Sequence, residues 1–465
     1  MFINTSTHSG GRSMLCVEPD AMSQSERKSW RGVSFASFAM KYKCVSMLVC
    51  LATVLPGWGT AVASTKLRKT EIAPFTRNLD SAAISPDGSL VAILRTTEGG
   101  SVDHIDGPLM PGMSLHTVFT FENQLEVRDV ATSALRTTVA LPTVREPESM
   151  SGFSFLFHSH IQYCDHGKYL LAYGEGGTFF VLDGDTYEQK FTIVFDKDKY
   201  PVGVKRERGS VLVVTASACS ANANIAAIEL LFGPYGTGVT KVFDLDTGKQ
   251  IEDITEDISP GRLMNIDVSP SGASAVIAVE RVSLDNPPAK NDDLVILDLQ
   301  SGAVSRRILT GIDLLQAVFV GESSVAAASG DGVILKAKPS VLLFDIHSGA
   351  VTNRVADPEN GANGEVAASA DGRFLLAYTG KENHCEHCQI EEHRGQLQIE
   401  DARFTIWDLS TGKVVVRSPH IPVAHGGVLS FTTYWRPVFQ ISQSGNAVLV
   451  TQITGSEPID VYSLK

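Results

Sequence analysis

The residues best suited to chemistry in this 465-residue chain are crowded into one short segment towards its C-terminal end. The segment contains five side chains that bind metals in proteins: His384, Cys385, His387, Cys388 and His393. Thiolate and imidazole groups are the ligands of zinc and of other borderline metals. Cys385 and Cys388 have the spacing of a zinc knuckle, and the histidines could complete a set of four ligands. We therefore treat the segment as a candidate site for zinc or another divalent metal.

A disulfide between Cys385 and Cys388 explains the same two cysteines equally well. A single C-x-x-C lacks the second knuckle of a well-defined zinc site, and Gln389 stands where a haem-attachment motif requires histidine. Three interpretations stay open at this point: a metal site, a local disulfide, and a polar loop with no specific role.

A second polar segment, residues 96–124, holds acidic residues and histidines among glycine and proline. Long connections inside a compact fold are usually functional or disordered. We expect the long connections of this chain, the two polar segments among them, to lie on one face of the protein and to form a binding face there. Its candidate residues are Asp103, His104, Asp106, His116, His425, Trp435 and Arg436. The chain has no nucleophile elbow, phosphate loop, dinucleotide fingerprint or H-E-x-x-H motif, so no catalytic or cofactor-binding residue is assigned.

The elements that must position these residues are set by a repeat. The unit V-x-D-[LIV]-x-[ST]-G is clearest at Val242–Gly248 and Trp407–Gly412, and it recurs at intervals of roughly 50 to 60 residues. Its aspartate falls at Asp129, Asp183, Asp244, Asp298, Asp345 and Asp408, with Ser463 in the seventh place. Such a period indicates one supersecondary unit stacked many times.

A turn precedes each of these corners, as in the S-P-D-G sequence Ser85–Gly88, and a short apolar run follows it. Each unit is therefore expected to contain four antiparallel strands. The fold class is all-β, a seven-bladed β-propeller of four-stranded antiparallel blades. The seventh unit stops at Lys465 after its third strand, so we expect Thr65–Ile72 to supply its missing outer strand and close the ring.

A secretory signal is expected at 40–63, because two lysines, an apolar stretch and the small-x-small end Ala61–Ala63 follow one another there. Residues 1–39 are expected to be an untranslated or disordered leader, with Met40 as the true start. Residues 64–465 form the propeller. A lipoprotein anchored at Cys50 is the alternative, although the small residue expected before that cysteine is missing. The protein is expected to be periplasmic or secreted, with no stable membrane span after cleavage.

The net charge of −13 at pH 7 disfavours nucleic acid as a partner, because nucleic-acid binding needs clustered lysine and arginine. Another protein or a small ligand is the expected partner, and the protein is expected to be a monomer. In an oxidising compartment Cys164 and Cys219 could pair, since both lie at the first turn of neighbouring blades. The separation of the two blades could also hold them more than ~7 Å apart, which would prevent the bond.

The S-P-D-G turns, together with the corners Val242–Lys249 and Phe404–Lys413, resemble the WD40-like and YVTN-type propellers of exported bacterial proteins. Strict WD40 repeats differ, because only Trp407-Asp408 gives the W-D dipeptide. Relatives of this shape include binding scaffolds, sugar-acid lactonases and large subunits of quinoprotein amine dehydrogenases, so fold alone does not fix function. We expect a non-catalytic extracytoplasmic scaffold that binds a protein or ligand through its loop-rich face. The alternatives are a hydrolase or lactonase with a metal at the mouth of the ring, and an electron-transfer subunit.

Overall fold

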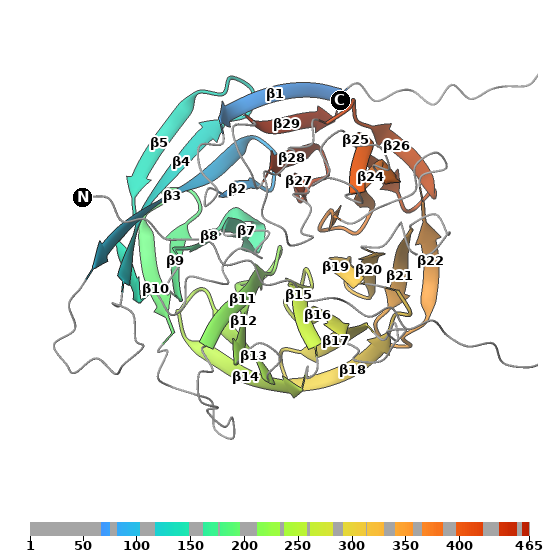
Figure 1. Cartoon of the computed structure of the whole chain (residues 1–465), viewed down its shortest axis with the longest axis horizontal. Coiled ribbons are helices and arrows are strands. Elements are labelled where there is room, and N and C mark those ends of the chain that lie inside the picture. Colours follow the sequence, from blue (N-terminus) through green and yellow to red (C-terminus); the bar gives the residue numbers. More distant parts are fainter. Residues whose placement is uncertain are drawn as a thin grey trace, which may run out of the picture. The chain divides into compact units, whose positions relative to one another are not determined.

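The chain divides into two units, Met1–Thr60 and Ala61–Lys465. The computed structural model describes residues of the second unit only: 67–74, 81–102, 117–147, 161–174, 177–195, 212–232, 237–257, 261–281, 292–312, 314–329, 340–356, 365–384, 397–421, 437–452 and 458–464. Within that unit the described strands form seven antiparallel sheets arranged around a central axis (Figure 1). The predicted seven-bladed β-propeller is confirmed.

Each blade uses four strands, here called a to d from the axis outwards. Blade 1 has β2 (Ser81–Ile84), β3 (Leu90–Val102), β4 (Thr117–Asp129) and β5 (Leu135–Ala140), with β6 (Val144–Pro147) also paired to β4. Blade 2 has β7 (Ile161–Cys164), β8 (Tyr169–Tyr173), β9 (Thr178–Asp183) and β10 (Gln189–Val194). Blade 3 has β11 (Leu212–Cys219), β12 (Ile225–Phe232), β13 (Thr237–Asp244) and β14 (Gln250–Asp257).

The remaining blades follow the same order. Blade 4 has β15 (Gly261–Val268), β16 (Ser274–Arg281), β17 (Asp293–Asp298) and β18 (Ala303–Leu309). Blade 5 has β19 (Leu314–Val320), β20 (Ser324–Ser329), β21 (Val341–Asp345) and β22 (Val351–Val355). Blade 6 has β23 (Val366–Ala368), β24 (Phe374–His384), β25 (Leu397–Asp408) and β26 (Lys413–Arg417). Blade 7 has β27 (Pro437–Ile441), β28 (Ala447–Gln452), β29 (Pro458–Leu464) and, as its outer strand, β1 (Leu67–Pro74).

The strand β1 closes the ring, as the incomplete last repeat predicts. It pairs antiparallel with β29 from Leu67 opposite Leu464 to Pro74 opposite Pro458, two residues further along the chain than expected. Lys69 of β1 forms a 2.7 Å ion pair with the buried carboxylate of Asp460 in β29. The two ends of the described chain thus hold each other, and no outer edge of blade 7 is left unpaired along β29.

The corner of each repeat is a turn held by its aspartate. In blade 3 the Oδ1 atom of Asp244 accepts bonds from the backbone N–H and the hydroxyl of Thr247, at 2.8 and 3.1 Å. Gly248 then takes the left-handed conformation at φ 69°, and a Cβ there would lie 2.9 Å from the ring of Phe191. In the repeats of blades 1 and 2, where the corner has no glycine, Ser133 and Tyr187 stand at the same position and have a φ of 60°. The repeated residues are therefore explained by the turn.

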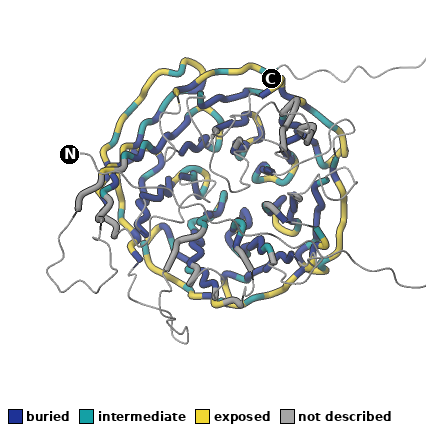
Figure 2. The backbone as a smooth tube through the Cα atoms, in the orientation of Figure 1, coloured by how far each residue is buried: buried dark blue, intermediate teal, exposed yellow. Residues whose placement is uncertain are grey.

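The core lies between neighbouring blades. Apolar side chains of one sheet pack on the next, as Leu94 and Phe121 of blade 1 do against Leu170 and Phe180 of blade 2. Trp407 of the W-D dipeptide is 4% exposed and belongs to the layer between blades 5 and 6. Figure 2 shows buried inner strands and exposed residues along the outer strands. The rigid ring thus fixes the inner strands, which face the axis.

Candidate functional site: the central channel

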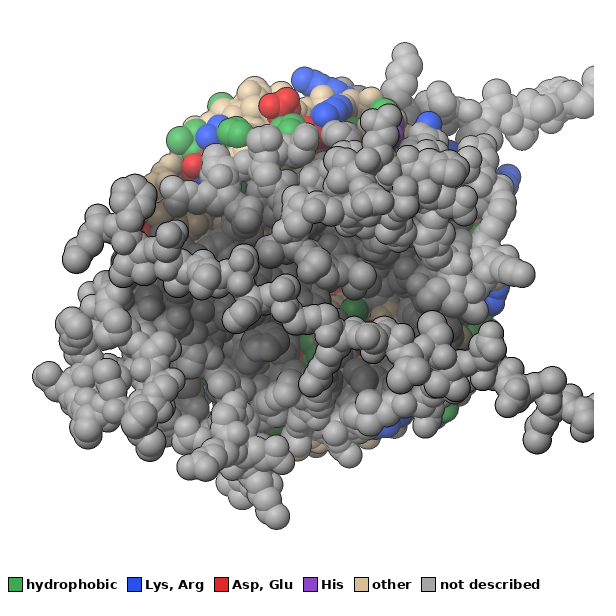
Figure 3. Space-filling view, in the orientation of Figure 1, with side chains coloured by type: hydrophobic (Ala, Val, Ile, Leu, Met, Phe, Trp, Pro, Cys, Tyr) green, Lys and Arg blue, Asp and Glu red, His purple; other side chains and the backbone are tan. Residues whose placement is uncertain are grey.

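The inner strands of the seven blades enclose a channel with a cavity of about 260 Å³. Every blade contributes to its wall. In the space-filling view a few hydrophobic side chains are visible near the middle of the face shown (Figure 3). The polar side chains among the described lining residues are Gln162, Tyr163, Tyr173, Ser217, Asn265, Asp267, Gln316, Ser369, Gln440 and Gln443. Its apolar wall includes Met264, Val318, Phe319, Val438, Phe439 and Ile441. The wall is thus a mixture of polar and apolar side chains, and enclosed cavities of this kind are where proteins hold small molecules.

Side-chain amides join the inner strands of neighbouring blades around the channel. Gln162 of β7 accepts a bond from the N–H of Cys219 in β11 at 3.1 Å and donates to the same residue's carbonyl at 3.4 Å. Gln440 of β27 accepts from Ile84 in β2 at 3.3 Å and donates to Ala82 at 3.1 Å. The free edge of an inner strand has unpaired backbone groups, and these amides satisfy them in both directions.

Blade 4 makes the same kind of contact twice. Asn265 of β15 accepts from the N–H of Ala317 in β19 at 2.9 Å and donates to its carbonyl at 2.7 Å. Two residues further on, Asp267 accepts from the N–H of Phe319 at 2.7 Å. Gln316 continues the pattern by accepting from Val366 in β23 at 2.8 Å. Blades 4, 5 and 6 are therefore linked directly along the channel wall.

Asp267 is the single charged side chain among the described residues that line the cavity. Burial raises the pKa of Asp267 to about 7, and it outweighs the backbone N–H groups of Phe319 and Val268, which lower the pKa. The Asp267 residue lines the cavity and is partly buried by the protein around it. A carboxyl group in such a place changes charge near neutral pH.

The channel is bridged at the end where the first turn of each blade lies. The side-chain amide of Gln443 in blade 7 donates to the carbonyl of Ala221 in blade 3, on the opposite side of the ring, at 3.1 Å. In the same turn of blade 3, the N–H of Asn222 donates to the carbonyl of Pro270 in blade 4 at 3.0 Å. These bonds hold the turns together across and around that end of the channel.

Cys164 and Cys219 form a disulfide between blades 2 and 3, beside the channel. Their Cα atoms are 5.6 Å apart, within bonding range, although the distance between blades had made this pairing doubtful. The blades converge towards the axis, so the ends of neighbouring inner strands are close. The N–H of Asp165 accordingly donates to the carbonyl of Ser220 at 2.9 Å.

The predicted metal and binding-face residues lie almost entirely outside the described residues. Those outside are Asp103, His104, Asp106, His116, Cys385, His387, Cys388, His393, His425, Trp435 and Arg436. His384 ends β24, opposite Leu397. Among the described residues no group of three or more His, Cys, Asp or Glu side chains is placed to hold a metal ion. The metal site and the disulfide Cys385–Cys388 stay predictions.

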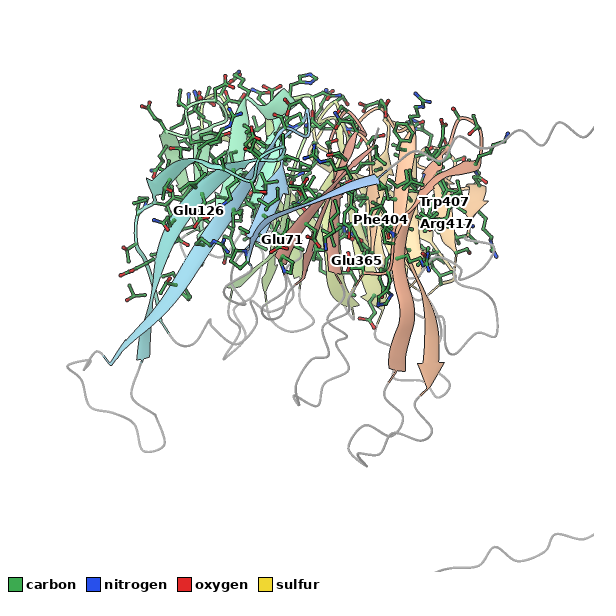
Figure 4. All side chains as sticks on the ribbon, turned by 90° about the horizontal axis from the view of Figure 1, so that it is seen from above. Glu71, Glu126, Glu365, Phe404, Trp407 and Arg417 are labelled. Carbon is green, nitrogen blue, oxygen red and sulfur yellow. A yellow bond between two sulfur atoms is a disulfide. The ribbon has the colours of Figure 1, made fainter. Side chains whose placement is uncertain are left out.

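Two hairpins extend beyond the ring on the same face (Figure 4). In blade 1 the pairing of β3 with β4 continues to Val102 opposite Thr117, and in blade 6 the pairing of β24 with β25 continues to His384 opposite Leu397. These strands lead into the two polar segments that the sequence picks out. Blade 7 lies between the two hairpins.

The channel residues are missing from the sequence-based candidates. Asp267 and Asn265 stand in the run N-I-D-V directly before the turn Ser269–Gly272. Polar residues in an otherwise apolar inner strand could have drawn attention to them. Their pairing with the next blade, however, depends on contacts about 50 residues apart in sequence.

The fold and the channel define a seven-bladed β-propeller whose outer strand in the last blade comes from the N-terminal side of the described chain. Comparison with known protein families found no family that matches the sequence, and comparison with curated proteins found no matching sequence. No helix among the described residues is long and apolar enough to cross a membrane.

Proposed function

We propose that the protein is a non-catalytic extracytoplasmic scaffold that holds a protein partner or ligand on the face from which the β3–β4 and β24–β25 hairpins extend. The observation that carries this proposal is that pair of hairpins. Their strands are 11 to 13 residues long, whereas the b and c strands of the other blades have five to eight. The two projecting hairpins, one on either side of blade 7, frame a surface that the ring itself does not need.

Two further observations support the proposal. The repeated aspartates are used in turns, as Asp244 is, and the repeated motif therefore supplies no catalytic group. The disulfide between Cys164 and Cys219 suits an oxidising compartment, which agrees with the signal expected at 40–63. Export, with residues 1–39 as a leader and the mature protein beginning near Ser64, is part of the proposal.

Shortened hairpins test the binding face. In one variant an Asn-Gly turn replaces residues 101–118, directly beyond the pair Gly100 and Phe119, and in the other it replaces 383–398, beyond Glu382 and Ile399. Phe121 and Val144, which are buried, stay in place in the first variant. Leu309→Ser on the outer strand of blade 4 is the matched control, because Leu309 is 73% exposed and lies away from the hairpins.

Partners crosslinked to the full chain in the extracytoplasmic fraction are compared with those crosslinked to each variant. We expect both hairpin variants to lose the same partner, and Leu309→Ser to keep it. An unchanged set of partners for both folded hairpin variants would refute the proposed face. Turnover of a lactone that stops when either hairpin is shortened would replace the scaffold with the hydrolase alternative.

A further inference from the structure

One row of equivalent positions on the channel wall carries a carboxyl group in blade 4 and amides in blades 2 and 7. The other four blades have apolar residues there: Ala83, Ala218, Val318 and Ala367. Register places Asp267, Gln162 and Gln440 at the same point of their inner strands. On strand b of each blade, the residue paired with the corner aspartate (with Ser463 in blade 7) is the reference. Each of the three side chains belongs to the strand-a residue that lies opposite the position two residues after this reference. Each accepts a hydrogen bond from the next blade. The amides of Gln162 and Gln440 also donate one back to the strand that they contact, which an ionised carboxylate cannot do.

A carboxylate is a poor choice if joining blades is the whole task. Asn265 on the same strand joins the same two blades without charge, at 2.9 and 2.7 Å. Removing a carboxylate from water carries a free-energy penalty that an amide avoids. The charge of Asp267 therefore points to a role besides the link to Phe319.

Among the described side chains, none beside Asp267 carries a compensating positive charge. The described lining residues include no lysine, arginine or histidine. Tyr163 and Tyr173 are the other titratable groups of the wall, and burial raises the pKa of Tyr163, which keeps it neutral. On the strands packed against β15 the described charged side chains are Glu229 of β12 and Glu280 of β16. All of these are acidic or neutral.

The rest of the wall suits an organic ligand. Met264, Val318 and Phe319 lie near Asp267 in sequence or across the blade boundary, and they make part of the wall apolar. A divalent metal ion needs several carboxylate or imidazole ligands, and a single carboxylate does not provide them. A pocket with one acid beside apolar wall residues fits a cation that has an apolar body. At about 260 Å³ the cavity is slightly below the usual range of ligand pockets, roughly 300 to 1,000 Å³, so the ligand is small.

We propose that the central channel binds a small organic ammonium ion, whose positive head pairs with the Asp267 carboxylate while its apolar body contacts the inner-strand side chains. This site is separate from the hairpin face, so either can fail in its test without affecting the other. Because the pKa of Asp267 is about 7, binding of the cation near neutral pH releases a proton from the protein.

The test uses the mature chain and the probe benzylammonium, with benzyl alcohol and benzoate as neutral and anionic probes of the same shape. Titration calorimetry at pH 8 is expected to give a Kd of about 1 mM for benzylammonium, and no saturable binding of the other two. Asp267→Asn keeps an oxygen that accepts from Phe319, and it should weaken benzylammonium binding about tenfold or more. Asp253→Asn, on the exposed side of β14, is the matched control and should leave the Kd unchanged.

The proton gives a second, independent readout. Benzylammonium affinity for the unmodified chain should fall as the pH drops from 8 to 5, because Asp267 becomes protonated and neutral. Repeating the titration near pH 7 in two buffers with different ionisation enthalpies should show release of a fraction of one proton, absent in Asp267→Asn. Equal affinity for benzyl alcohol, no effect of Asp267→Asn, or no binding of benzylammonium would each overturn the proposal.

Discussion

The raised pKa of Asp267 predicts how the stability of the ring depends on pH. Its ordinary value is 3.8, and in the folded protein the pKa is about 7 because of burial. A group with a higher pKa in the folded state holds its proton more tightly there than in the unfolded chain. The free energy of unfolding should therefore fall as the pH rises from about 4 to about 7, and stay low above that range.

The size of the effect follows from the shift. A difference of about 3 pKa units corresponds to about 4 kcal/mol at pH 8, since each unit is about 1.4 kcal/mol. Asp267 is partly exposed, and solvent screening reduces this value, so a loss of about 2 to 4 kcal/mol is expected between pH 4 and pH 8. In Asp267→Asn the loss should disappear, because an amide does not ionise and its oxygen still accepts from Phe319.

Urea unfolding of the unmodified chain and of Asp267→Asn at pH 4, 6 and 8 measures the difference directly. Subtracting one curve from the other removes the contributions of the remaining titratable groups. We expect the two proteins to be about equally stable at pH 4, and the variant to be more stable by about 2 to 4 kcal/mol at pH 8. A variant that is less stable at pH 8, or a difference that does not change with pH, would refute the reasoning.

Two more predictions concern how the ring is held together. Deleting residues 64–72 removes most of β1 and the Lys69–Asp460 ion pair, and it should lower the Tm by roughly 10 °C or more. A chain beginning at Ser64 is the control and should melt like the full chain. Equal Tm values for the deletion variant and this control would contradict ring closure. Replacing both Cys164 and Cys219 with alanine should lower the free energy of unfolding by about 4 kcal/mol, because the bond closes a loop of 55 residues. Reductant should lower the stability of the unmodified chain only. Identical urea midpoints for the variant and the unmodified chain under oxidising conditions would argue against the bond.

The fold could be predicted because its determinants are local. An aspartate two or three residues before a Thr or Ser N–H makes its turn without help from the rest of the chain, as Asp244 and Asp345 do. The short apolar runs between turns, rich in valine, isoleucine and leucine, are typical of buried strands. Even ring closure followed from counting strands, because the last repeat lacks one.

The candidate site could not be predicted in the same way. The sequence drew attention to histidines and cysteines at 384–393, where metal-ligand chemistry is recognisable from spacing alone. The channel residues show no such pattern, because Gln162 bonds to Cys219, 57 residues away, and Gln440 to Ile84, 356 residues away. Only the folded ring brings these side chains to one wall.

The sequence by itself determined the number of blades, the position of every corner and the origin of the closing strand, because turns and strand patterns depend on neighbouring residues. The tertiary structure decided that Cys164 reaches Cys219, that two hairpins extend from one face, and that Asp267 is the charged group of the described channel wall. These features depend on how closely the blades converge at the axis, and on the burial that convergence produces. Burial, in turn, sets the pKa of Asp267.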